Sequence, residues 1–180
     1  MSTTTVSTTR IRFITITAVA LAASAALPVL VHLLPAGASG PIGPRLLPIF
    51  FAPLIAVLMG RPGVALITAA LAPVINHLLT GSPAPAMLAT LTLQLLLFAA
   101  ALTVLRKPAR ALLPLLAPLA YLGAVLAVPH VLGFLTGFPW LSGLAVIPAP
   151  QAGALLLQAW PGLLVIALIT FGMNRVLTKN

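Results

Sequence analysis

The chain contains no Asp and no Glu among its 180 residues, whereas 61% of the residues are hydrophobic and only 5% are charged. A water-soluble domain of this length needs a polar outer surface, and this composition has too few polar side chains to form one. The mean hydropathy of +1.22 points the same way. We therefore expect the chain to be embedded in a lipid bilayer.

The missing carboxylates also limit the chemistry of the chain. Asp and Glu are the usual acids, bases, proton relays and hard-cation ligands of membrane proteins. The sequence contains no cysteine and none of the motifs GxxxxGK[ST], HExxH or GxSxG. We therefore expect no enzymatic activity, no cofactor and no metal site. Any function must use neutral polar groups, imidazoles and the backbone.

Six apolar runs can be drawn along the sequence. They are 13–34, 46–60, 64–79, 85–105, 111–135 and 153–173. At 1.5 Å per residue the second and third reach only about 22 to 24 Å, so they must thin the bilayer or be shielded by neighbouring helices. These runs predict an all-α polytopic membrane protein: one integral domain over 1–180, with six transmembrane helices over 13–174 and short tails at 1–12 and 175–180.

The basic residues predict the orientation of these spans. The formal charge of +9 comes from Lys and Arg residues that are scattered in ones to threes, which is typical of topology signals and not of a nucleic-acid interface. With both termini in the cytoplasm, only Arg45 lies outside. The cytoplasmic set is Arg10, Arg12, Arg61, Arg106, Lys107, Arg110, Arg175 and Lys179. Such a bias follows the positive-inside rule and favours an even number of spans in the cell membrane.

Prolines fall inside several of the predicted spans. They are Pro28, Pro53, Pro73, Pro114, Pro118 and Pro129. Each of these prolines leaves one helical carbonyl without its usual donor, and such a carbonyl must find a partner away from lipid. We therefore expect the helices that carry them to pack against protein.

The amino-terminal run allows a second interpretation. Arg10 and Arg12 precede an apolar run that contains Ala23-Ser24-Ala25, a pattern that resembles a cleavable secretory signal. The run continues for several apolar residues beyond this triplet, which is too long for an ordinary signal core. We therefore favour a retained first span.

Small residues recur on the first span. Ala18, Ala22 and Ala26 are spaced four residues apart and share one helix face. A face without bulky side chains lets another helix approach closely in lipid. This alanine ridge (Ala18, Ala22 and Ala26) suits docking to a separate protein, although close packing within the chain would use the same face.

The three histidines lie near the predicted outer ends of odd-numbered spans. His32 belongs to the first span, His77 to the third and His130 to the fifth, and Asn76 precedes His77. Neutral imidazoles at that depth can hydrogen-bond a ligand or bind a borderline metal. An interfacial histidine that bonds only to backbone or water would show the same pattern.

Other polar residues extend this candidate binding site. Arg45 lies in the first outer connection and Trp140 in the third and longest, 136–152, which suits a lid over a site. Gln94 and Gln158 lie inside the fourth and sixth spans. An amide in hydrocarbon needs partners, so both should face the bundle interior. Trp140 as an aromatic anchor and Arg45 as a lipid headgroup contact are open alternatives.

The middle of the chain resembles a known family. Three stretches carry the resemblance: PIGPRLLP at 41–48, GRPG at 60–63 and APVINHLLTGSP at 72–83, followed by a helix with Gln94. This pattern is similar to the substrate-binding membrane subunits (S components) of energy-coupling factor vitamin transporters. The match covers roughly residues 13–105, and the remainder fits by size and number of spans.

The resemblance implies a six-helix subunit that captures a vitamin or related micronutrient outside the cell. In the family, such a subunit docks on a transmembrane coupling subunit driven by two ATPases, and an alanine ridge on the first helix makes the contact. The family's pocket would include His77, His130, Trp140 and Gln158. Related sequences often carry Glu where this chain has Gln94, which puts a charged group there in doubt. The partners implied are lipid, a small vitamin-like molecule and the coupling subunit.

The resemblance also bears on the substrate. The amino-terminal Met-His motif of the nickel and cobalt members is missing, which counts against a bare metal ion. Some solitary members are similar to cobalamin transporters, and a corrinoid cobalt accepts an imidazole ligand such as His77 or His130. The alternative function is that of a non-transporting membrane interaction or assembly protein, for which the alanine ridge alone would suffice.

Overall fold

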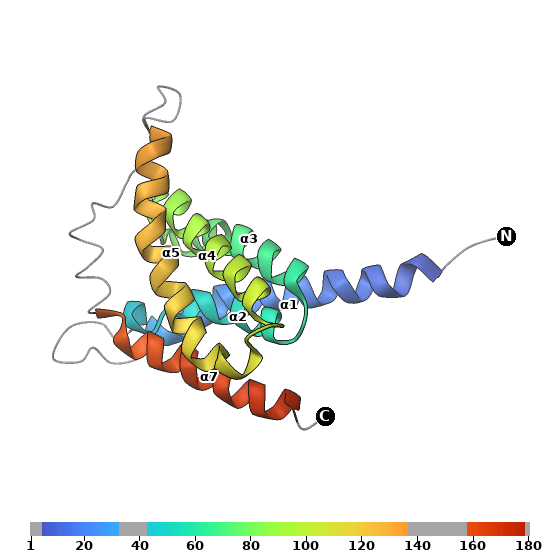
Figure 1. Ribbon diagram of the computed structural model, residues 1–180. Coiled ribbons are helices and arrows are strands. Elements are labelled where there is room, and N and C mark those ends of the chain that lie inside the picture. Colours follow the sequence, from blue (N-terminus) through green and yellow to red (C-terminus); the bar gives the residue numbers. More distant parts are fainter. Residues whose placement is uncertain (1–4, 33–42, 137–157, 179–180) are drawn as a thin grey trace.

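The computed structural model describes residues 5–32, 43–136 and 158–178, and all the regular secondary structure in these ranges is helical (Figure 1). The elements are α1 (Thr5–His32), η1 (Gly43–Leu46), η2 (Pro48–Phe50), α2 (Phe51–Leu58), α3 (Pro62–Thr80), α4 (Pro85–Leu105), η3 (Arg110–Leu112), α5 (Leu113–Thr136) and α7 (Trp160–Thr178). The predicted all-α class is confirmed for these residues.

Five of the described helices are long and apolar enough to cross a membrane. The candidate spans are Thr8–Leu30, Pro62–Thr80, Met87–Leu105, Arg110–Phe134 and Trp160–Leu177. The predicted run 46–60 instead holds a shorter apolar helix, Pro48–Leu58. Helical structure also reaches into the predicted tails, because α1 begins at Thr5 and α7 ends at Thr178. The chain therefore has the helices of a multi-pass membrane protein.

Proline and glycine set several helix bounds. Pro62 and Pro85 open α3 and α4, where the first turn needs no backbone donor from its first residue. Gly81 follows α3 with φ 72°, the left-handed conformation that ends many helices. In the second apolar run, Leu47 has φ 55° and Pro48 begins a separate short helix. This break explains why the helical segment of the second run begins only at Pro48.

The core lies where η2, α4 and α5 meet. The Phe50 ring packs edge to face with the Phe98 ring, at a centroid distance of 5.3 Å, and with the Tyr121 ring, at 4.9 Å. Phe50 is 2% exposed and Phe98 is fully buried. Edge-to-face aromatic pairs add to the free energy of burial. Phe50 thus anchors the segment 43–58 inside the bundle.

Helices α1 and α3 run side by side in the same direction. A Cβ placed on Gly63 would lie 3.4 Å from the Phe13 ring, and farther along both helices the Asn76 side chain bonds to the Ser24 backbone. α1 lies at the edge of the bundle: only 11% of its apolar window is buried, against 39% for α3. One side of α1 is therefore not covered by the described part of the chain.

Two ends of the bundle can be told apart by their contacts. We call the first the basic end. One cavity there is lined by residues that include Met59, Arg106, Lys107 and Asn174. At the second, the opposite end, a Cβ on Gly162 would lie 2.6 Å from the carbonyl oxygen of Arg45. The segment 43–58 therefore runs along α7 from one end to the other.

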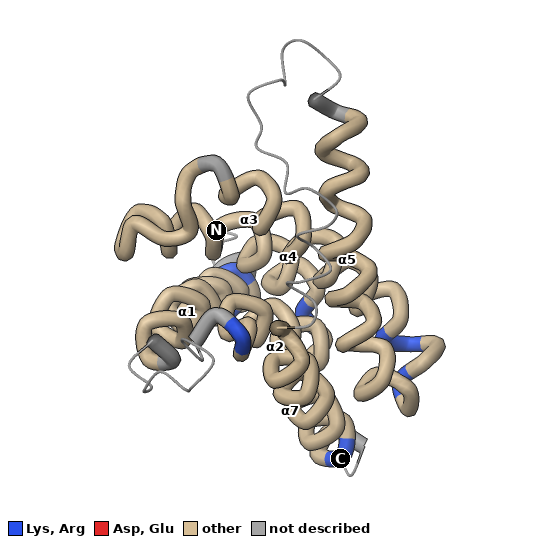
Figure 2. Tube along the Cα trace, turned by 90° about the vertical axis from the view of Figure 1, so that its left-hand side faces the viewer, with Lys and Arg blue, Asp and Glu red and all other residues tan. Residues whose placement is uncertain are grey.

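The basic residues lie outside the middle of the central helices. No Lys or Arg occurs between positions 62 and 105 or between 113 and 136, which include α3, α4 and α5. In Figure 2 the blue segments accordingly lie in α1, in α7 and in the connections. The central helices of the bundle carry no cation.

Candidate functional site

Asn76 joins the carboxyl-terminal half of α3 to α1. Its side chain is 3% exposed, and its Nδ2 donates a hydrogen bond of 3.1 Å to the backbone oxygen of Ser24. Ser24 lies four residues before Pro28, which has no N–H to donate to that oxygen. The Asn76 amide thus replaces the helical bond that Pro28 removes. The carbonyl that Pro28 frees therefore has a partner within the protein, as the sequence predicted.

Further hydrogen-bonding capacity remains at buried positions of α1 and α3. The Asn76 Oδ1, Ser24 Oγ and Thr68 Oγ1 atoms are buried and have no hydrogen-bond partner in the part of the chain that the structure describes. Thr68 lies two turns before Asn76 on the same side of α3. Ser24 and Thr68 were missed by the sequence analysis. The signal for Ser24 was present, because a residue four positions before an in-helix proline has a freed carbonyl.

His77 is held by the turn that follows α3. Its ring Nδ1 lies 2.9 Å from the Pro83 carbonyl oxygen, and its own backbone oxygen accepts a 2.8 Å bond from the Gly81 N–H. A carbonyl can only accept, so Nδ1 carries the proton in this contact. In the neutral ring, Nε2 is then the atom with the lone pair, and it can accept a hydrogen bond or bind a metal.

The other two histidines lie on α1 and α5. His130 is exposed on α5, and the carboxyl-terminal part of this helix rises beyond the other helices in Figure 1. His32 is the last residue of α1, and its side chain lies outside the described residues. Among the residues that the structure describes, no three His, Cys, Asp or Glu side chains come together as a metal site would need.

The remaining predicted site residues are spread over three elements. Gln94 is 9% exposed and points into the bundle from α4, as an amide within a span should. Gln158 is exposed just before α7, and Arg45 is half-buried in η1. Trp140 lies outside the described residues. Asn76 and His77 are neighbours in sequence near the carboxyl terminus of α3.

The alanine ridge lies on the open side of α1. Ala18, Ala22 and Ala26 are all exposed, whereas Thr17 and Ser24 on the same helix are buried. The described part of the chain therefore packs on the other side of α1. The ridge is a smooth surface on which a second helix can lie at close range.

No protein-family model matches this chain, and it matches no curated protein and no solved structure.

Proposed function

We propose that this chain is the substrate-binding subunit of an importer of the energy-coupling factor type. It binds a vitamin or related micronutrient and works with a transmembrane coupling partner driven by ATPases. The observation that carries the proposal is the exposure of Ala18, Ala22 and Ala26 on α1. The ridge is a row of small residues that packing within the described chain leaves uncovered.

The proposed topology has six passes with both termini in the cytoplasm of a cell membrane. Two features support it. The segment 43–58 runs alongside α7 between the two ends of the bundle, so it can serve as the short second pass. The turn after α2, the connection after α4 and the carboxyl-terminal part of α7 meet at the basic end around one cavity. Under the positive-inside rule this end faces the cytoplasm.

The proposed ligand site lies at the opposite end, around the carboxyl terminus of α3. His77 contributes Nε2, because its Nδ1 is held by the Pro83 carbonyl. A corrinoid cobalt is one ligand centre that accepts such an imidazole. Replacing His77 with Ala should weaken cyanocobalamin binding by the purified protein, and replacing the exposed His130 should not. Equal binding by both variants and the unchanged protein would remove the corrinoid from the proposal.

The docking role is tested by adding bulk to the ridge. Ala22→Phe fills the smooth face, so uptake of the substrate into cells should be lost while the purified subunit still binds its ligand. Ala100→Phe is the matched control, because Ala100 is also an exposed alanine but lies on α4. It should leave both uptake and binding intact. Normal uptake by Ala22→Phe would contradict the docking role.

A non-transporting assembly protein is the second candidate, and the same exposed ridge favours it. The two functions differ in what remains bound after purification in mild detergent. A transport subunit carries a stoichiometric small molecule, which mass spectrometry identifies. An assembly protein carries only other polypeptides.

A further inference from the structure

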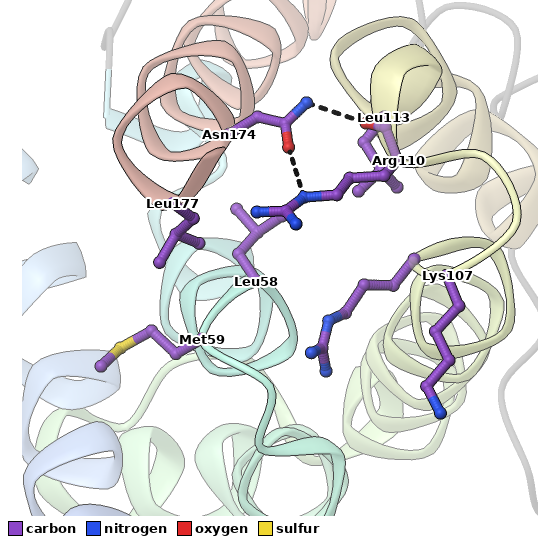
Figure 3. Close-up of a pocket in the computed structure, with 8 residues that line it drawn as sticks. Leu58, Met59, Lys107, Arg110, Leu113, Asn174 and Leu177 are labelled. Carbon is purple, nitrogen blue, oxygen red and sulfur yellow. Dashed lines mark hydrogen bonds between the residues drawn. The ribbon is translucent and has the colours of Figure 1, made fainter. Parts of the chain in front are cut away.

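A cavity of about 370 Å³ opens at the basic end, between the end of α2, the connection from α4 to α5 and the carboxyl-terminal part of α7. Its polar lining consists of Arg106, Lys107, Arg110 and Asn174 (Figure 3). This volume is in the range of small-molecule sites. Three cationic side chains and one amide thus share one concave surface.

No acidic side chain in this protein can balance the positive charge of this cavity. Because the chain has no Asp and no Glu, no side-chain carboxylate can pair with Arg106, Lys107 or Arg110. Cations that share a cavity repel one another, and an anion between them removes that repulsion. The ligand that suits the cavity is therefore negatively charged, and no side chain of this protein can supply that charge.

Arg110 is oriented by a reciprocal pair of hydrogen bonds with α7. Its Nε donates to the Asn174 Oδ1 at 3.2 Å, and the Asn174 Nδ2 donates to the Arg110 backbone oxygen at 2.8 Å. Figure 3 shows the Arg110 side chain extending towards Asn174. Since this contact uses Nε, the terminal amino groups of the guanidinium can form the paired bonds that Arg makes with phosphate.

Arg106 is placed by the turn between α2 and α3. A Cβ on Gly60 would lie only 2.8 Å from the Arg106 Nη2, so the guanidinium rests against this glycine. Gly60 has φ 81°, a conformation that glycine adopts without strain. The turn therefore fixes a second guanidinium beside the cavity. Lys107 is exposed and points away from Arg110 in Figure 3, which leaves it on the rim.

The rest of the lining is apolar. Leu58 and Leu113 are buried at 7% and 1% exposure, and Met59 and Leu177 are exposed at 56% and 37%. The cavity thus combines a cationic wall with an apolar wall that continues onto the outer surface of the bundle. A free phosphate ion would use only the first wall. A phospholipid uses both, because its headgroup and its acyl chains are joined.

We infer that the basic end binds the phosphate headgroup of an anionic phospholipid, with Arg106 and Arg110 on the phosphate and acyl chains along Met59 and Leu177. The site is separate from the proposed ligand site at the opposite end and does not depend on the transport function. It would fasten the short α2 segment to α5 and α7 at the membrane surface.

Native mass spectrometry of the full chain in detergent tests the inference. The protein is titrated with dioleoyl phosphatidylglycerol, with dioleoyl phosphatidylcholine and with soluble glycerol phosphate. We expect phosphatidylglycerol to bind most tightly. Each cation near a phosphate contributes about a fivefold change in affinity, so Arg110→Gln should weaken its binding about fivefold and the combined Arg106→Gln, Lys107→Gln, Arg110→Gln variant about 100-fold.

The matched control is Arg12→Gln, which removes one exposed cation of α1 outside the cavity. It should change the phosphatidylglycerol affinity less than twofold. Equal binding of the two lipids, or an equal loss in Arg12→Gln and Arg110→Gln, would overturn the inference. Displacement of the lipid by an equal concentration of glycerol phosphate would assign the cavity to a soluble phosphate instead. If Arg110→Gln does not fold, Arg106→Gln and Lys107→Gln give the same comparison.

Discussion

The hydrogen bond from Asn76 to Ser24 should be energetically coupled to Pro28. In the unchanged chain, Pro28 provides no N–H to the Ser24 oxygen, and the Asn76 Nδ2 bonds to this oxygen at 3.1 Å. Asn76→Ala leaves a buried acceptor unpaired, which costs about 1 to 3 kcal/mol in general. Interhelical hydrogen bonds in membrane proteins average about 0.6 kcal/mol with a maximum near 1.7. We expect a loss of unfolding free energy towards the upper part of that second range.

The same substitution should cost less when Pro28 is replaced by alanine. The Pro28→Ala change restores the backbone N–H, so the Ser24 oxygen regains its helical donor and no longer depends on Asn76. The cavity left by the shortened side chain is the same in both backgrounds and cancels in a double-mutant cycle. The coupling energy should therefore be about 0.6 to 1.7 kcal/mol.

The cycle is measured by denaturant titration of the four purified proteins in one detergent. A coupling energy above about 0.5 kcal/mol, with the larger Asn76→Ala cost in the Pro28 background, is the expected result. If Asn76→Ala costs the same in the unchanged chain and in the Pro28→Ala variant, the freed carbonyl is not what Asn76 stabilises. The reasoning about in-helix prolines in this chain would then be wrong.

Two further pairs of variants test the packing. Gly162→Ala places a Cβ 2.6 Å from the Arg45 carbonyl oxygen, whereas Gly172→Ala on the same helix meets nothing within 4 Å. Because helix propensity cancels between the two, Gly162→Ala should unfold about 2 to 12 °C below Gly172→Ala in thermal melts. Equal melting temperatures would deny the close contact of η1 with α7. Phe50→Ala should lower the unfolding free energy by about 3 to 5 kcal/mol, whereas the exposed Phe171→Ala should lower it by about 1 kcal/mol or less. Similar losses in denaturant titrations of both variants would place Phe50 outside the core.

Composition and apolar run lengths predicted the helical membrane class and most helix bounds. The fourth run, 85–105, coincides with α4 (Pro85–Leu105). The third began two residues late, because Pro62 opens α3 as its first helical residue. The second run was drawn as one 15-residue span, yet Leu47 is left-handed, so the helical segment made of η2 and α2 begins only at Pro48 and ends at Leu58. A count of apolar residues does not detect such a local break.

The candidate sites depended more on contacts between distant parts of the chain. Asn76 was assigned to a polar pocket from its place beside His77, but its partner is Ser24, 52 residues earlier. Arg106, Lys107 and Arg110 were interpreted only as topology signals. Their cavity appears when the end of α2 and Asn174 of α7 join them, and no local pattern carries that information.

The side of the membrane on which the basic end and the opposite end lie can be tested directly. The chain contains no cysteine, so a single introduced thiol reports its own position. Lys107→Cys and Ser82→Cys lie at exposed positions at the basic end and the opposite end. In sealed vesicles, a membrane-impermeant maleimide should label Lys107→Cys only from the cytoplasmic side and Ser82→Cys only from the outer side. Labelling of both from the same side would contradict a bundle that spans the bilayer with its basic end in the cytoplasm.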